Sequence, residues 1–134
     1  MRARLMPILL LTAMGGCSLF SSQQKFTVYF EPYSAKLGLQ SLETIQAAGR
    51  YAQDHPWLPV AVIGYAAPPD REHDADNLSA QRADVVKEVL VGDGLGATRI
   101  VIKANGVTDP GRAPGLEMRR VDIEVGQEAT IAAR

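Results

Sequence analysis

Apolar residues recur along this chain with two different periods, and the shorter period indicates strands. Residues 26–30, FTVYF, are rich in aromatic and β-branched side chains and are followed closely by Pro32. The run VAVIGY at 60–65 is apolar throughout, as expected of a strand that is covered on one face and central in its sheet. RIVIKA at 99–104 and VDIEV at 121–125 indicate two further strands, the last with strict alternation.

The longer period indicates two helices. Apolar residues at helical spacing extend over about 38–54, and this helix ends before Pro56 because the residue preceding a proline is pushed out of helical geometry. A second broad apolar face runs from Leu78 to Leu90 and stops at Gly92. We therefore expect an α/β (α+β) domain of order β-α-β-α-β-β. Its two helices should pack on one face of a small mixed sheet, and the first two crossovers should return each strand parallel to its predecessor.

The start of the chain has the pattern of a secretory signal peptide. Arg2 and Arg4 precede an apolar stretch at 5–14, which is about half as long as the roughly 20 apolar residues that a membrane-spanning helix needs. The chain is therefore expected to divide into a signal peptide, a lipidated cysteine with a short polar tether, one folded domain and a frayed tail, at residues 1–16, 17–25, 26–126 and 127–134.

Cys17 is the single cysteine of the chain, and an unpaired thiol in an exported protein calls for an explanation. The run LTAMGGC resembles a bacterial lipobox, in which the peptide is cut before the cysteine and the cysteine then carries lipid, including palmitate. Ser18 follows it, and in the lipoproteins that this sequence resembles, a residue other than aspartate there implies transfer to the outer membrane. We expect a periplasmic domain that lipid on Cys17 anchors to the cell outer membrane. The alternative is a soluble secreted protein with an incidental thiol.

Charge and motif content exclude several classes of function. The formal net charge is -1 and the basic residues form no cluster, so the electrostatic footprint of a nucleic-acid-binding protein is missing. The sequence has no G-x-S-x-G turn and no glycine-rich phosphate loop, so we expect neither an enzyme nor a cofactor. The alternating acids of residues 70–76 lack the glycine of a calcium loop, and we expect no metal. Trp57, between two prolines, is expected to lie as a lid over the end of the first helix, with partner binding as the alternative.

The second helix carries a more specific pattern. Its run LS-x-x-RA-x-x-V-x-x-x-L resembles the signature of the OmpA-like C-terminal domain family, and VYFEPYSAKL, GY and RRVDIEV resemble other parts of that family. The resemblance implies non-covalent binding of peptidoglycan through meso-diaminopimelate, which an aspartate after the second strand and the signature arginine grip. Arg82 matches that arginine. The expected ligand-binding residues are Arg82, Leu78 of the same signature and Arg120 of the paired arginines.

The chain departs from the family pattern around this expected pocket. Ala67 stands where the family has the aspartate, and Met118 replaces the asparagine that commonly precedes the paired arginines. Truncating one side of a buried charge pair costs about 2–5 kcal/mol, so binding should be weak or lost unless an acid of the following loop replaces the missing carboxylate. Asp70 is the nearest candidate, ahead of Glu72, Asp74 and Asp76.

Two roles for Arg82 and two functions for the protein remain open. Arg82 either binds the ligand or is a structural arginine whose head pairs with the protein's own groups. The protein is either an outer-membrane lipoprotein that tethers the membrane to peptidoglycan by weak non-covalent binding, or a divergent OmpA-like module. Such a module has lost diaminopimelate binding and serves as a protein-interaction component of an envelope assembly.

Overall fold

The computed structural model describes residues 23–68, 74–107 and 115–126, and the predictions made for the signal peptide, Cys17 and the tail lie outside these residues. The predicted fold class and order of elements are confirmed. The strands are β1 (Gln24–Tyr29), β2 (Val60–Ala66), β3 (Ile100–Val107) and β4 (Arg120–Val125). The helices are α1 (Leu39–Asp54) and α2 (Ala75–Gly92), and two short 3-10 turns are η1 (Ala97–Arg99) and η2 (Leu116–Met118).

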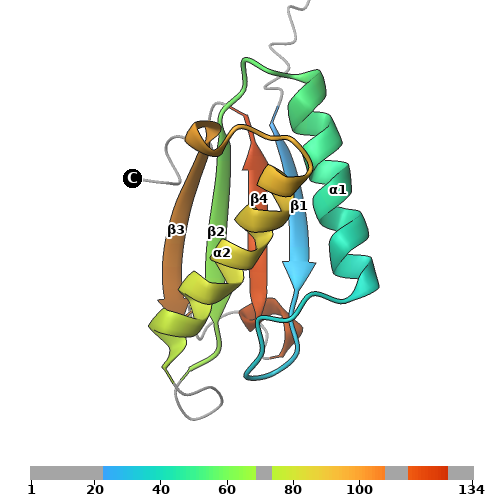
Figure 1. Cartoon of the computed structure of the whole chain (residues 1–134). Coiled ribbons are helices and arrows are strands. Elements are labelled where there is room, and N and C mark those ends of the chain that lie inside the picture. Colours follow the sequence, from blue (N-terminus) through green and yellow to red (C-terminus); the bar gives the residue numbers. More distant parts are fainter. Residues whose placement is uncertain (1–22, 69–73, 108–114, 127–134) are drawn as a thin grey trace, which may run out of the picture.

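The four strands form one mixed sheet in the order β1-β4-β2-β3 (Figure 1). β4 pairs antiparallel with both β1 and β2, so these two strands run parallel to each other with β4 between them. β2 pairs parallel with β3, as expected from the long crossover that joins them. β1 begins two residues earlier than predicted because Gln24 and Lys25 pair with the end of β4. β3 continues past residue 104 because Val107 pairs with Ala66 across a bulge.

Both helices lie over the same face of the sheet (Figure 1). α1 packs on β1 and on α2, whereas α2 packs on β2 and β3. The core between these layers comes from the inward-facing positions of each element, which include Val28, Ile45, Ala48, Ala52, Val60, Val62, Ala83, Val86, Leu90, Val121, Ile123 and Val125. No helix in the described part of the chain is both long enough and apolar enough to cross a membrane.

Contact between α2 and the sheet is unusually close at Gly64. A Cβ atom on this residue would lie 2.0 Å from the carbonyl oxygen of Ser79 and 3.2 Å from Cβ of Ala83. Only glycine allows the helix backbone to approach the strand this closely. The glycine of the GY pair thus places the first half of α2 against the end of β2.

Different loops and element ends lie at the two ends of the domain (Figure 1). The lower end of Figure 1 contains the β1–α1 loop, the end of β2, the start of α2 and η2. The upper end contains the start of β1, the end of α1, and the loops that join α1 to β2 and α2 to β3.

Candidate functional site

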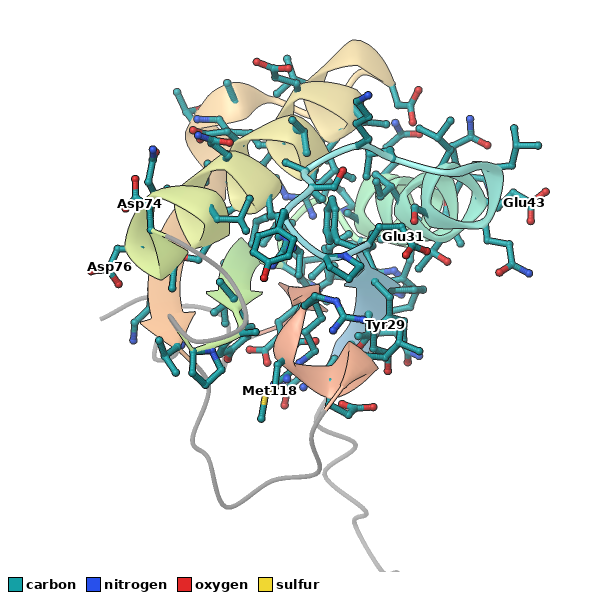
Figure 2. The ribbon with its side chains drawn as sticks, turned by 90° about the horizontal axis from the view of Figure 1, so that it is seen from below. Tyr29, Glu31, Glu43, Asp74, Asp76 and Met118 are labelled. Atoms are coloured by element: carbon teal, nitrogen blue, oxygen red, sulfur yellow. The ribbon has the colours of Figure 1, made fainter. Side chains whose placement is uncertain are left out.

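Most residues that the sequence analysis singled out lie at the lower end, which Figure 2 shows from below. α2 supplies Leu78 and Arg82, the end of β2 leads into Ala67, and η2 and β4 supply Met118 and Arg120. Asp70 and Glu72 lie in residues 69–73, outside the described residues, so their predicted part in the site stays a prediction.

Arg82 is completely buried, with 0% of the residue exposed, although it carries a charged head. Its Nε donates a hydrogen bond to the carbonyl oxygen of Ser34 at 2.9 Å, and its Nη2 donates one to that of Glu31 at 3.1 Å. Its Nη1 donates a third to the carbonyl oxygen of Tyr65 at 3.1 Å. The guanidinium also lies 5.4 Å from the centre of the Phe30 ring, within the range of a cation–π contact.

These contacts make Arg82 a link between three parts of the chain. Two of the carbonyls belong to the β1–α1 loop and the third to β2, whereas the arginine itself is on α2. Hydrogen bonds from a charged donor contribute about 1.5–3 kcal/mol each, so together they fix the loop against the helix and the sheet. This is the geometry described above for a structural arginine, and ligand binding by Arg82 stays a prediction.

The position of the family's aspartate is apolar in this protein. Ala67 is 1% exposed, and the preceding Ala66 forms a small buried cluster with Ala75 and Leu78, against which Ala35 packs. Leu78 is thus a packing residue between the start of α2 and the end of β2. No carboxylate is available from β2 itself to balance the ammonium group of a ligand.

The acids at the start of α2 lie at the margin of this end. Figure 2 shows Asp74 and Asp76 on the opposite side of the lower end from Tyr29, Glu31 and Glu43. Asp74, with φ and ψ of 55°, precedes the helix, and its Oδ2 accepts a hydrogen bond from Nδ2 of Asn77 at 3.1 Å. Both acids are exposed, so the structure places them on the surface of the helix start.

Ser79 connects the start of α2 to β3. Its hydroxyl donates to the carbonyl oxygen of Asp76 at 2.8 Å and accepts from the backbone N–H of Gly106 at 3.1 Å. Gly106 has a φ of 58°, and a Cβ there would lie 2.2 Å from Oδ1 of Asp76. The serine of the signature therefore has a structural role that the sequence analysis did not assign.

Arg120 lies on the other face of the sheet from the helices. It alternates with Val121, which faces the helix-covered core, and its guanidinium stacks 4.2 Å from the centre of the Tyr65 ring. Its Nε contacts both carboxylate oxygens of Asp122, at 3.2 and 3.3 Å, and its Nη1 donates to the carbonyl oxygen of Glu117. β2 thus separates Arg120 from Arg82, and the structure does not bring these two predicted ligand-binding residues into one pocket.

Asp122 is the most buried carboxylate of the described residues, with 1% of the residue exposed. Besides Arg120 it contacts Nζ of Lys25 at 2.9 Å, and it accepts a hydrogen bond from the hydroxyl of Thr27 at 3.0 Å. The alternation of VDIEV placed this acid on the polar face of its strand. The sequence contained no signal for its burial, because its partners come from a strand about 95 residues away.

A cleft of about 850 Å³ runs along the free edge of β1, and the sequence analysis did not predict it. It is lined by residues 27–31, by the start of α1 and by Leu116. Leu39 is 82% exposed and Leu116 is also exposed, so the rim of the cleft is partly apolar. The hydroxyl of Tyr29 donates to Oε1 of Glu117 at 3.1 Å, and burial together with this hydrogen bond raises the pKa of the tyrosine above its usual value.

No group of three or more histidine, cysteine, aspartate or glutamate side chains suited to a metal ion occurs among the residues that the structure describes. What the lower end offers is a buried cation, apolar surface and backbone carbonyls. The apolar part of this surface suits contact with another molecule.

The OmpA family model matches residues 29–122, which is more than half of the chain. No curated protein sequence matches this chain.

Several solved structures share its fold. The OmpA-like domain of FopA1 from Francisella tularensis has a TM-score of 0.67 and 21% sequence identity, with 77% of this chain and 71% of that chain covered. The periplasmic domain of MotB from Helicobacter pylori has a TM-score of 0.65 and 17% identity, with 83% and 82% covered. The peptidoglycan-associated lipoprotein from Burkholderia pseudomallei has a TM-score of 0.62 and 18% identity, with 75% and 88% covered.

Proposed function

Because this chain belongs to the OmpA family, we propose that it is a lipid-anchored module of the cell envelope that binds peptidoglycan weakly and without covalent bonds. The anchor is lipid on Cys17, which holds the domain at the periplasmic side of the outer membrane. The lipobox-like run LTAMGGC supports this part of the proposal. The exposed apolar surface at the lower end, which includes Leu39 and Leu116, supports a binding role.

One observation carries the proposal of weak binding: the chain keeps the signature arginine but lacks the aspartate of the family pattern. Arg82 occupies the signature position at the carboxyl end of β2, and the buried Ala67 stands where the aspartate would hold the ligand ammonium. An ammonium that enters this site is desolvated without its partner, which costs about 2–5 kcal/mol in binding free energy. Affinity for a diaminopimelate-containing muropeptide is therefore expected to be about 30-fold to several thousandfold below that of a complete site.

Titration of the protein with such a muropeptide tests the proposal, with calorimetry as the measurement. Ala67→Asp restores the carboxylate and is expected to strengthen binding by about 1–3 kcal/mol, which is the net contribution of a charged hydrogen bond. The matched control is Ala97→Asp, an exposed alanine of η1 at the upper end, which is expected to leave binding unchanged. If neither the native protein nor Ala67→Asp binds the muropeptide, the proposal is wrong.

A second candidate function is favoured by the cleft along β1. Its exposed leucines and the outer edge of β1, on which no strand of the described residues pairs, are features of protein-binding surfaces, and edge strands readily accept an added strand. In this case the module serves as a protein-interaction component of an envelope assembly. A photo-crosslinking amino acid at Leu39 is then expected to yield one defined adduct in intact cells, and the same probe at Asp84 on the outer side of α2 is expected to yield none.

A further inference from the structure

Trp57, the single tryptophan of the chain, lies in the loop between α1 and β2 at the upper end of the domain. It is 69% exposed, although an aromatic side chain of this size contributes substantial stability when it is buried. Its ring meets that of His55, the residue that ends α1, in an edge contact at 5.7 Å. It therefore touches the end of the helix, as the sequence predicted, but leaves most of its surface in solvent.

The loop that carries Trp57 is fixed by hydrogen bonds. Nε of Arg99 donates to the carbonyl oxygen of Leu58 at 2.8 Å, and its Nη2 donates to that of His55 at 2.5 Å. Burial lowers the pKa of this arginine from its usual value. The backbone N–H of Gly126 also donates to the carbonyl oxygen of Pro59 at 3.0 Å. Backbone contacts on both sides of Trp57 thus hold it at the surface, and its exposure is a property of the fold.

The loop next to that of Trp57 carries small side chains. The neighbouring α2–β3 loop, tied to the same carbonyls through Arg99, carries exposed glycine, alanine and threonine at residues 92, 94 and 96–98. Asp54 and Asp93 are exposed acids of this end, and Lys25 at the start of β1 is an exposed cation there. A large aromatic ring with a polar N–H, set among small side chains, is the kind of group that partitions into the headgroup region of a membrane.

The tether identifies the surface that Trp57 meets. β1 begins with Gln24 at the same end as Trp57, and Cys17 precedes Gln24 by seven residues. Seven residues span at most about 25 Å. If Cys17 holds lipid, the upper end of the domain stays within this distance of the membrane at all times.

We propose that Trp57 inserts into the headgroup region of the membrane that holds the lipid on Cys17, so that the domain docks with its upper end on the membrane. The inference rests on the lipid anchor of the proposed function. In this orientation the lower end, with Arg82 and the cleft, points away from the membrane. Because Asp54 and Asp93 are exposed at the same end of the domain, anionic headgroups do not drive the contact, and a higher salt concentration does not weaken it.

Tryptophan fluorescence tests the inference, since Trp57 is the single tryptophan. The lipidated chain is incorporated into vesicles of phosphatidylethanolamine and phosphatidylglycerol, with and without lipids brominated on their acyl chains. The expected result is a blue shift of the emission and its quenching by the brominated lipids, and neither effect is expected to decrease when the salt concentration is raised. The matched control carries Trp57→Phe and Tyr33→Trp, which moves the tryptophan to an exposed position at the lower end, and its emission is expected to escape quenching.

The outcomes separate the inference from the anchor on which it rests. Mass spectrometry of the N-terminal peptide and sedimentation with the vesicles report the anchor independently of the fluorescence. An anchored protein whose Trp57 emission is neither shifted nor quenched overturns the inference and leaves the anchor in place. A blue shift that follows protein concentration, without quenching, assigns Trp57 to contact with a second copy and also overturns it. A chain that carries no lipid on Cys17 overturns both.

Discussion

Arg82 carries a full positive charge in the interior of the domain, and its guanidinium donates hydrogen bonds to three backbone carbonyl oxygens. A carbonyl oxygen has a partial negative charge, so each bond lowers the cost of removing the guanidinium from water. The shape of the guanidinium contributes to these bonds as much as its charge does. Its N–H donors point in different directions, and so do the carbonyls of residues 31, 34 and 65 around it. An ammonium group cannot reach all three.

Replacing Arg82 by alanine is therefore expected to lower the free energy of unfolding by about 3–5 kcal/mol, since it removes a buried side chain and leaves three backbone carbonyls without their charged donor. Arg82→Lys is expected to recover only a small part of this loss. Urea unfolding followed by circular dichroism measures both values. Arg50→Ala, an exposed arginine on α1, serves as the control and should change stability by less than about 0.5 kcal/mol. An Arg82→Lys variant as stable as the native protein would contradict the argument.

Tyr29 provides a test that depends on pH. Burial, followed by its hydrogen bond to Glu117, raises its pKa above 10.0, so the folded state holds the proton more tightly than the unfolded chain. The resulting stabilisation is complete below pH 10 and is lost as the pH rises through the raised pKa of the folded state. Glu117→Gln removes the negative charge, and the absorbance titration of Tyr29, identified by difference from Tyr29→Phe, is expected to move down toward 10. Glu88→Gln, on α2, should leave it in place, and an unchanged titration in Glu117→Gln would show that the contact is absent in solution.

At the scale of elements, the sequence predicted what depends on neighbours along the chain. Period and stop signals placed both helices and four strands, because burial of one face imposes a periodicity on each element. Periodicity does not specify pairing partners, so the position of β4 between β1 and β2 could not be derived from it. The burial of Asp122 escaped prediction for the same reason, since Lys25 and Thr27 approach it only through that pairing. At the site, the family signature identified Arg82, but its carbonyl partners are backbone atoms that leave no mark in the sequence.

The close approach of α2 to β2 gives a prediction for a whole element. In Gly64→Ala the new methyl group would lie 2.0 Å from the carbonyl oxygen of Ser79, so the helix must move away from the sheet. The expected loss of stability is about 3 kcal/mol, with a lower melting temperature in calorimetry. Gly92→Ala is the matched control, because a Cβ there meets no atom within 4 Å, and it should be neutral or slightly stabilising. Equal melting temperatures for the two variants would show that α2 tolerates the displacement.

For the whole molecule, the proposal of a lipid anchor gives a prediction about where the protein is found. Replacing Cys17 by serine removes the thiol that would carry lipid, and the protein is then expected to move from the membrane fraction to the soluble periplasmic fraction. Fractionation followed by immunoblotting measures the distribution. Ser21→Ala, in the tether, is a control that should remain with the membranes. Sedimentation of Cys17→Ser with the membranes would overturn the lipid anchor.

The central position of β4 determines when this domain can fold as the chain emerges. β4 is the last strand of the part of the chain that the structure describes, yet both of its edges are paired, with β1 on one side and β2 on the other. A chain that emerges from its N-terminus onward, from a ribosome or through a membrane channel, therefore has β1 without a partner until residue 125 has emerged. Contacts between the two extremes of the chain also form slowly, because a long loop must close first. The four-stranded sheet of such a chain therefore cannot be completed until almost all of the chain has emerged, and until then β1 has no strand to pair with.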